Sequence, residues 1–108
     1  MDVRKRRFIM KVFRDAHDIS VKVGEDFGIA LKVLSASGYE WHVVRQPDLV
    51  QPLGSEFKVA TASVGAESEQ ILRFKSRKAG EAVLDLECKT AWDAQPYQTR
   101  SIKIKVVK

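Results

Sequence analysis

Residues 26–34 read DFGIALKVL, and this stretch decides which fold class the sequence indicates. Its larger apolar side chains recur at every second position, as they do in a strand with one face against a core. The residues on this face are Phe27, Ile29, Leu31 and Val33. Such a period of two, repeated along a chain, is typical of antiparallel sheets that have one side in water.

The same alternation returns four more times, at 39–43, 71–75, 82–88 and 102–106. Turn-forming sequences separate the alternating stretches, among them VGED, SASG, QPLG, VGAES, KAGE and DAQP. No segment carries an apolar helical stripe with capping residues. We therefore expect an all-β domain, an immunoglobulin-like antiparallel β-sandwich of about seven strands, with a small barrel as the alternative.

The phase of each alternating stretch also predicts the core. The residues expected to share it are Leu31, Trp41, Leu72, Phe74, Leu84, Leu86 and Ile104. Residues 45–63 are less regular and contain Pro47 and Pro52, which suits a long loop followed by an edge strand.

Length and composition favour one globular domain. The 108 residues are 44% hydrophobic and 31% charged, which is ordinary for a soluble folded chain, so we expect a single domain over 1–108 and a monomer. No apolar run approaches the roughly 20 residues that cross a bilayer. The start, MDVRKRRFIMKVF, makes a poor signal peptide, and the cellular compartment stays open.

The net charge of +5 raises the question of nucleic-acid binding. Six basic residues gather near the start: Arg4, Lys5, Arg6, Arg7, Lys11 and Arg14. A basic arm of this kind could contact phosphates. However, no ribonucleoprotein motif, zinc-finger spacing or recognition-helix pattern accompanies it. We expect residues 1–7 to be a solvated, partly frayed terminus and keep nucleic-acid binding as a lesser alternative.

Side chains for catalysis or metal binding are scarce. His17 and His42 fall on polar phases, and the single cysteine, Cys88, falls on the inward phase of its strand. One cysteine excludes an internal disulfide, and a buried thiol behaves as a small hydrophobic group. No metal-ligand spacing, phosphate-binding loop or nucleophile elbow is present. We expect no catalytic residue, metal, cofactor or small-molecule substrate, and hence no enzyme.

Three connecting stretches stand out from ordinary turns. They are SASG at 35–38, VGAES at 64–68 and KTAWDAQPY at 89–97. Trp92, in the third, has two interpretations: it caps the end of the core, or it is presented as an anchor for a partner. A sandwich gathers alternate loops at one end, so the three stretches can form one surface.

The order of these features resembles the chagasin family of cysteine-peptidase inhibitors. The resemblance runs from about Ser20 to Val107 and includes GE-x-F-x-I-x-L, then Gly-Tyr-x-Trp, Gly-Ala, Phe-Lys and K-A-G-x-A-x-L-x-L, followed by a loop with Trp. It implies an immunoglobulin-like sandwich whose three loops carry N-P-T-T-G-Y/F, G-x-G-G and R-P-W/F. In that family the loops form a wedge that fills the cleft of papain-like peptidases.

Carried onto this sequence, the family's loops keep only part of their motifs. The first keeps Gly38 and Tyr39 and lacks Asn-Pro, the second keeps Gly65 alone, and the third keeps Trp92 without Arg-Pro. The peptidase-binding residues that the resemblance implies are Ser35, Ala36, Ser37, Gly38, Tyr39, Gly65, Ala66, Glu67, Ser68, Thr90, Ala91 and Trp92.

The resemblance therefore implies a reversible, non-covalent inhibitor whose partner is a papain-like cysteine peptidase. The alternative is a non-inhibitory sandwich module that binds another protein or a glycan. The sequence leaves the target peptidase and the potency open.

Overall fold

The computed structural model describes residues 10–34, 37–58 and 68–108. These residues form eight strands, and no helix among them is long and apolar enough to cross a membrane. The strands are β1 (Lys11–Arg14), β2 (Asp18–Lys22), β3 (Asp26–Val33), β4 (Glu40–Arg45), β5 (Val50–Lys58), β6 (Ser68–Ser76), β7 (Gly80–Lys89) and β8 (Gln98–Val107).

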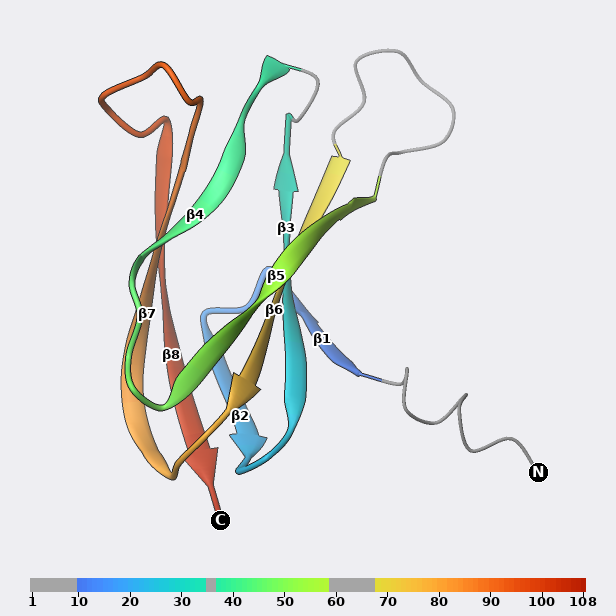
Figure 1. The fold of residues 1–108 in the computed structure, drawn as a ribbon, viewed down its shortest axis with the longest axis vertical. Helices are drawn as coiled ribbons and strands as arrows, with labels where there is room; N and C mark the ends of the chain where they lie inside the picture. The colour runs from blue at the N-terminus through green and yellow to red at the C-terminus, as the bar shows by residue number, and fades with distance from the viewer. Residues whose placement is uncertain (1–9, 35–36, 59–67) are drawn as a thin grey trace, which may run out of the picture.

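The strands form two four-stranded sheets, which confirms the expected sandwich. One sheet has the order β1-β3-β6-β5, and the other has the order β2-β8-β7-β4 (Figure 1). Each stretch that alternates in sequence lies on a strand, apart from Leu34, which directly follows β3, and Tyr39, which directly precedes β4. From β3 onward, every pairing between neighbouring strands is antiparallel.

The first two strands depart from the expected pattern of about seven antiparallel strands. β1 pairs with β3, and β2 pairs with β8, both in parallel. The chain changes sheet between them at Asp15, which has a φ of 52°. Strands of four and five residues carry too short an alternation to show which distant strand they join. The alternation in the sequence therefore does not predict these two parallel edge strands.

The irregular region contains an edge strand, but the loop before it is short. Only residues 46–49 separate β4 from β5, so the expectation of a long loop is wrong. β5 pairs with β6 alone, and its register shifts between Pro52 and Gly54. Proline is tolerated in such an edge strand because no second neighbour needs its missing N–H. Residues 59–63 lie outside the described part of the chain.

The core lies between the two sheets and contains all the residues expected in it. Phe27 of β3 and Phe74 of β6 stack with ring centroids 5.6 Å apart. Trp41 and Cys88 are also buried, as their phases predict. The surface-facing residues of these strands are mostly charged.

One polar side chain, Gln70 of β6, is completely buried and joins the sheets. The backbone N–H of Trp41 on β4 donates to Oε1 of Gln70 at 2.7 Å, and Nε2 of Gln70 donates to the carbonyl of Trp41 at 3.1 Å. The indole Nε1 of Trp41 in turn donates to the carbonyl of Lys32 at 3.1 Å. β4 is therefore bound along its free edge by groups from the opposite sheet.

The Gln70 bridge gives the first testable prediction. Gln70→Met keeps the approximate shape of the side chain and leaves the N–H and carbonyl of Trp41 buried without partners. Each orphaned group costs about 1–3 kcal/mol, so the free energy of unfolding in urea should fall by at least that amount. Gln51→Met, on the exposed edge strand β5, is the control and should change it by less than about 0.5 kcal/mol. Equal stability of the two variants would contradict a structural role for the bridge.

Candidate functional site

The strand ends that flank three connections, β3–β4, β5–β6 and β7–β8, lie at one end of the sandwich, at the top of Figure 1. The strand register shows how their bases are joined. Val33 at the end of β3 pairs with Ser68, and Lys58 at the end of β5 pairs with Glu69. In the other sheet Glu40 pairs with Lys89. We call this surface the loop end.

Five of the residues expected in the site fall outside the described residues: Ser35, Ala36, Gly65, Ala66 and Glu67. The remaining ones are Ser37, Gly38, Tyr39, Ser68, Thr90, Ala91 and Trp92. All of these lie at the loop end, in or beside the three connections.

The first and third connections touch through Gly38 and Trp92. A Cβ atom on Gly38 would lie 2.7 Å from Cη2 and 3.3 Å from Cζ3 of the Trp92 indole. Gly38 also has a φ of +86°, a conformation that other residues adopt only with strain. Trp92 is nevertheless 74% exposed. One edge of the indole thus contacts the first connection, and most of its surface is exposed to solvent. Trp92 is therefore not a core residue.

Backbone hydrogen bonds close the first connection tightly. The N–H groups of Ser37 and Tyr39 donate to the carbonyl of Leu34 at 3.1 and 3.4 Å. Ser37 and Gly38 are exposed, whereas Tyr39 is half-buried and packs against the core. Tyr39 therefore holds the base of the connection, and the two small residues lie at its surface.

The third connection is closed in a similar way. The N–H of Asp93 donates to the carbonyl of Thr90 at 3.4 Å, and the N–H of Tyr97 donates to the carbonyl of Cys88 at 2.8 Å. Ala91 and Trp92 are exposed between these bonds. Thr90 is buried, and so is Ser68 at the start of β6. These two side chains therefore lie below the exposed surface of the loop end.

Sequence analysis did not single out Tyr97, a second exposed aromatic residue at the loop end. It is 68% exposed, and its ring centroid lies 5.2 Å from that of Tyr39. The aromatic residue in the segment QPY, just before β8, was a usable signal.

Side chains that could bind a metal do not gather in the described part of the chain. No cluster of three or more His, Cys, Asp or Glu side chains that could hold a metal occurs in 10–34, 37–58 and 68–108. His17 and His42 are exposed, and Cys88 is buried. Desolvation by burial raises the pKa of the Cys88 thiol, which disfavours the reactive thiolate.

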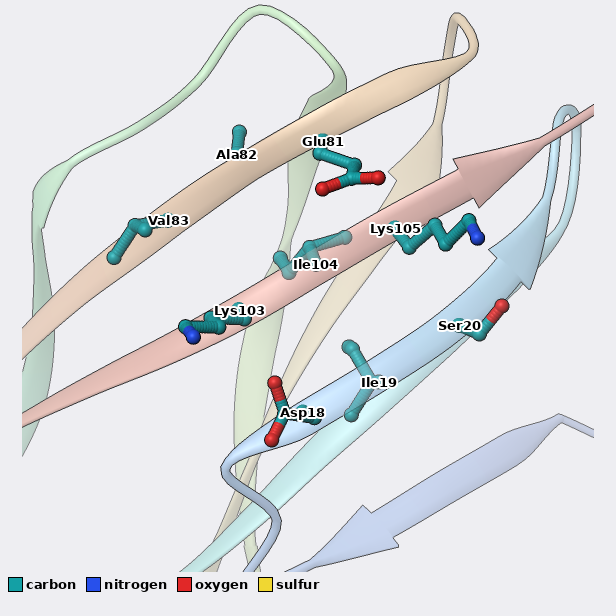
Figure 2. A pocket seen from close by; sticks show the side chains of 9 residues that line it. All are labelled: Asp18, Ile19, Ser20, Glu81, Ala82, Val83, Lys103, Ile104 and Lys105. Carbon is teal, nitrogen blue, oxygen red and sulfur yellow. The ribbon is translucent and has the colours of Figure 1, made fainter.

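A shallow hollow of about 540 Å³ lies on the outer face of the second sheet, away from the loop end. Figure 2 shows Lys103 and Lys105 on β8, flanked by Asp18 and Ser20 on β2 and by Glu81 and Val83 on β7. Charges of both signs alternate across it, as on an ordinary solvated sheet face. The expected basic terminus, residues 1–7, lies outside the described residues.

The position of Cys88 predicts its reactivity. Because the thiol is buried and its pKa is raised, an alkylating reagent at neutral pH should label it far more slowly in the folded protein than in denaturant. Mass spectrometry of timed samples measures both rates. Native labelling as fast as labelling of the unfolded chain would contradict the burial.

The contact between Gly38 and Trp92 predicts a local response to one methyl group. Gly38→Ala should displace the indole, and the Nε1–H signal of Trp92 should shift in a ¹H–¹⁵N spectrum. The signal of Trp41, whose indole is bonded to Lys32, provides an internal reference. Gly24→Ala is a matched control, because Gly24 has a φ of +89° and no atom within 4 Å of the added Cβ. A Trp92 signal unchanged by Gly38→Ala would show that the contact does not form in solution.

Comparison with known proteins agrees with the observed arrangement. A search of curated proteins gives no match. Among solved structures, the cysteine protease inhibitor EhICP2 from Entamoeba histolytica is 15% identical with a TM-score of 0.74, covering 90% of this chain and 95% of its own. Amebosin is 18% identical with a TM-score of 0.71, covering 91% and 98%. PbICP-C, solved in complex with falcipain-2, is 15% identical with a TM-score of 0.60, covering 89% and 91%.

These three structures share the fold with this chain, and their low identities support no more than that. The sequence itself carries the stronger match. The model of the chagasin family peptidase inhibitor I42 matches residues 20–106, from β2 to β8. That span leaves out β1 and includes the strands β3 to β7, most of β2 and β8, and all three connections of the loop end. The chain therefore belongs to the chagasin family of peptidase inhibitors.

Proposed function

We propose that this protein is a reversible, non-covalent inhibitor of papain-like cysteine peptidases, and that its loop end enters the active-site cleft as a wedge. The observation that carries the proposal is the contact between Gly38 and Trp92. It joins two connections far apart in sequence into one exposed surface, at positions where the family's binding motifs fall. The family membership supplies the class of target.

Such a surface would inhibit a peptidase by excluding substrate from the active-site cleft. Ser37, Gly38 and Ala91 are small and exposed, so the backbone at the loop end can approach an opposing wall closely. Trp92 adds a large apolar surface that would lose its water on binding. No side chain of the inhibitor needs to react, and a peptidase cleft filled in this way admits neither substrate nor attacking water.

Affinity in this mechanism depends on a loop end that is ordered before binding. Hydrogen bonds close the first and third connections, and the indole already rests on Gly38. A preformed surface loses less conformational entropy on docking than loose loops do. Protease–inhibitor interfaces bury on the order of 1,600 Å² in total, which is enough for tight binding when a few anchors are well placed.

The second connection is the part of the wedge that we propose from the sequence alone. Gly65, Ala66 and Glu67 occupy the family's second motif, and Ser68 begins β6. Glu67 brings a charge to a place where the family motif has glycine, and its desolvation would oppose binding unless the peptidase offers a partner. We therefore propose that this connection selects among peptidases.

Inhibition assays test the function directly. Titration of papain and of a cathepsin-like peptidase should show loss of activity at micromolar protein or below. Trp92→Ala should weaken inhibition by about thirtyfold or more, because a desolvated aromatic anchor contributes about 2 kcal/mol. Lys78→Glu, in the turn between β6 and β7 at the opposite end, is the control and should inhibit like the unaltered protein.

Two outcomes would refute the proposal. One is the absence of inhibition by the unaltered protein at micromolar concentration. The other is a folded Trp92→Ala variant whose inhibition constant equals that of the unaltered protein. Circular dichroism and urea unfolding establish whether the variant is folded, and the high exposure of Trp92 leads us to expect little loss of stability.

A further inference from the structure

The loop end carries an exposed aromatic side chain that lies outside the three family motifs. Tyr97 is the last residue of the third connection and directly precedes β8. It is the most exposed of the large hydrophobic residues after Trp92 among the described residues. Removing a large aromatic ring from water is favourable in free energy, and a ring that the fold leaves exposed can be removed from water only by a bound partner.

The position of Tyr97 is fixed by the fold. Its backbone N–H donates to the carbonyl of Cys88 at 2.8 Å, and the preceding residue is Pro96. Its ring lies 5.2 Å from the ring of Tyr39, which packs against the core. The ring is therefore ordered before any partner arrives, as in aromatic anchors at protein interfaces.

A small notch of about 90 Å³ opens beside the two tyrosines. Its lining includes Val33 and Leu34 at the end of β3 and Cys88 on β7, together with Lys32 and Gln98. Both tyrosines border it, so a side chain that enters the notch would contact two aromatic rings. Polar atoms make up much of the remaining accessible lining, so the two rings are what this place offers to an apolar side chain of a partner.

We propose that Tyr97 is a second anchor of the loop end, and that with Tyr39 it receives an apolar side chain from the rim of the peptidase cleft. This inference rests on the proposed function. Tyr39 belongs to the first connection and Tyr97 ends the third, so their surface is continuous with the one formed by Gly38 and Trp92. A peptidase that binds Trp92 in its cleft would contact Tyr97 through the wall beside that cleft.

Hydroxyl-radical footprinting of the unaltered protein, free and bound to papain, tests the placement without any substitution. Oxidation of Trp92 and of Tyr97 is measured separately by mass spectrometry. We expect both residues to be protected in the complex. Protection of Trp92 with unchanged oxidation of Tyr97 would overturn this inference and leave the proposed function intact. Absence of protection at both residues would overturn the two proposals together.

Inhibition constants provide the second readout. Tyr97→Ala should weaken inhibition by about tenfold, as expected for an anchor, and Tyr97→Phe should stay within about threefold because it keeps the ring. Val83→Ala is the matched control, since Val83 is an apolar residue, 44% exposed, on the outer face of β7 (Figure 2). It should leave inhibition unchanged.

The Trp92 indole signal shows whether Tyr97→Ala acts by removing a contact with the peptidase or by disturbing the third connection. If Tyr97→Ala weakens inhibition while this signal stays in place, the loss comes from the missing ring contact and supports the anchor. If the signal moves, as is expected for Gly38→Ala, Tyr97 acts by holding the third connection, and the anchor proposal is overturned. Full inhibition by Tyr97→Ala would overturn it as well.

Discussion

The arrangement of the loop end depends on one buried side chain, the amide of Gln70. β4 is the edge strand of its sheet, and the N–H and carbonyl of Trp41 bond to this amide. Left without partners inside the protein, those groups would oppose folding. Gln70 satisfies both with one side chain from the other sheet. The same interaction therefore completes the core and locks the two sheets at a fixed separation.

The position of this bridge matters as much as its strength. Trp41 lies shortly after the first connection, and Gln70 shortly after the second. The indole of Trp41 also bonds to Lys32, at the end of the strand that leads into the first connection. Fixing these bases limits how far the loop end can shift relative to the core. A serine on the same strand, Ser76, makes a similar tie at the other end, where the N–H of Glu25 donates to its hydroxyl at 3.1 Å.

Alternation predicted the strands and the core well because it reports burial directly. The phase of 26–34 places four apolar side chains in the core, and all four are buried. The same reasoning has no account of Gln70, since a polar residue on an inward phase conflicts with the pattern until its partners are known. The alternation also does not predict the parallel pairing of β1 with β3 and of β2 with β8, because these pairings depend on strands that are distant in the sequence.

The site could be predicted as a set of segments, and the structure adds the contacts between them. The family resemblance implies that the small residues at 35–38 bind a peptidase. For Gly38 the structure supplies a reason within the molecule, because the Trp92 indole occupies the space where a side chain would stand. The family motifs contain Gly38 and Trp92 separately, and no pattern in one sequence shows that the two residues touch.

This contact changes how binding energy at the loop end should be assigned. Trp92 is held by Gly38, and Tyr97 rests against Tyr39, so each exposed aromatic residue of the third connection is supported by the first. Residues in contact do not contribute additively, since altering the support also moves the anchor. In the proposed wedge, the two connections would therefore bind as one unit. The incomplete family motifs are physically compatible with binding, because Gly38 and the indole in contact with it are both retained.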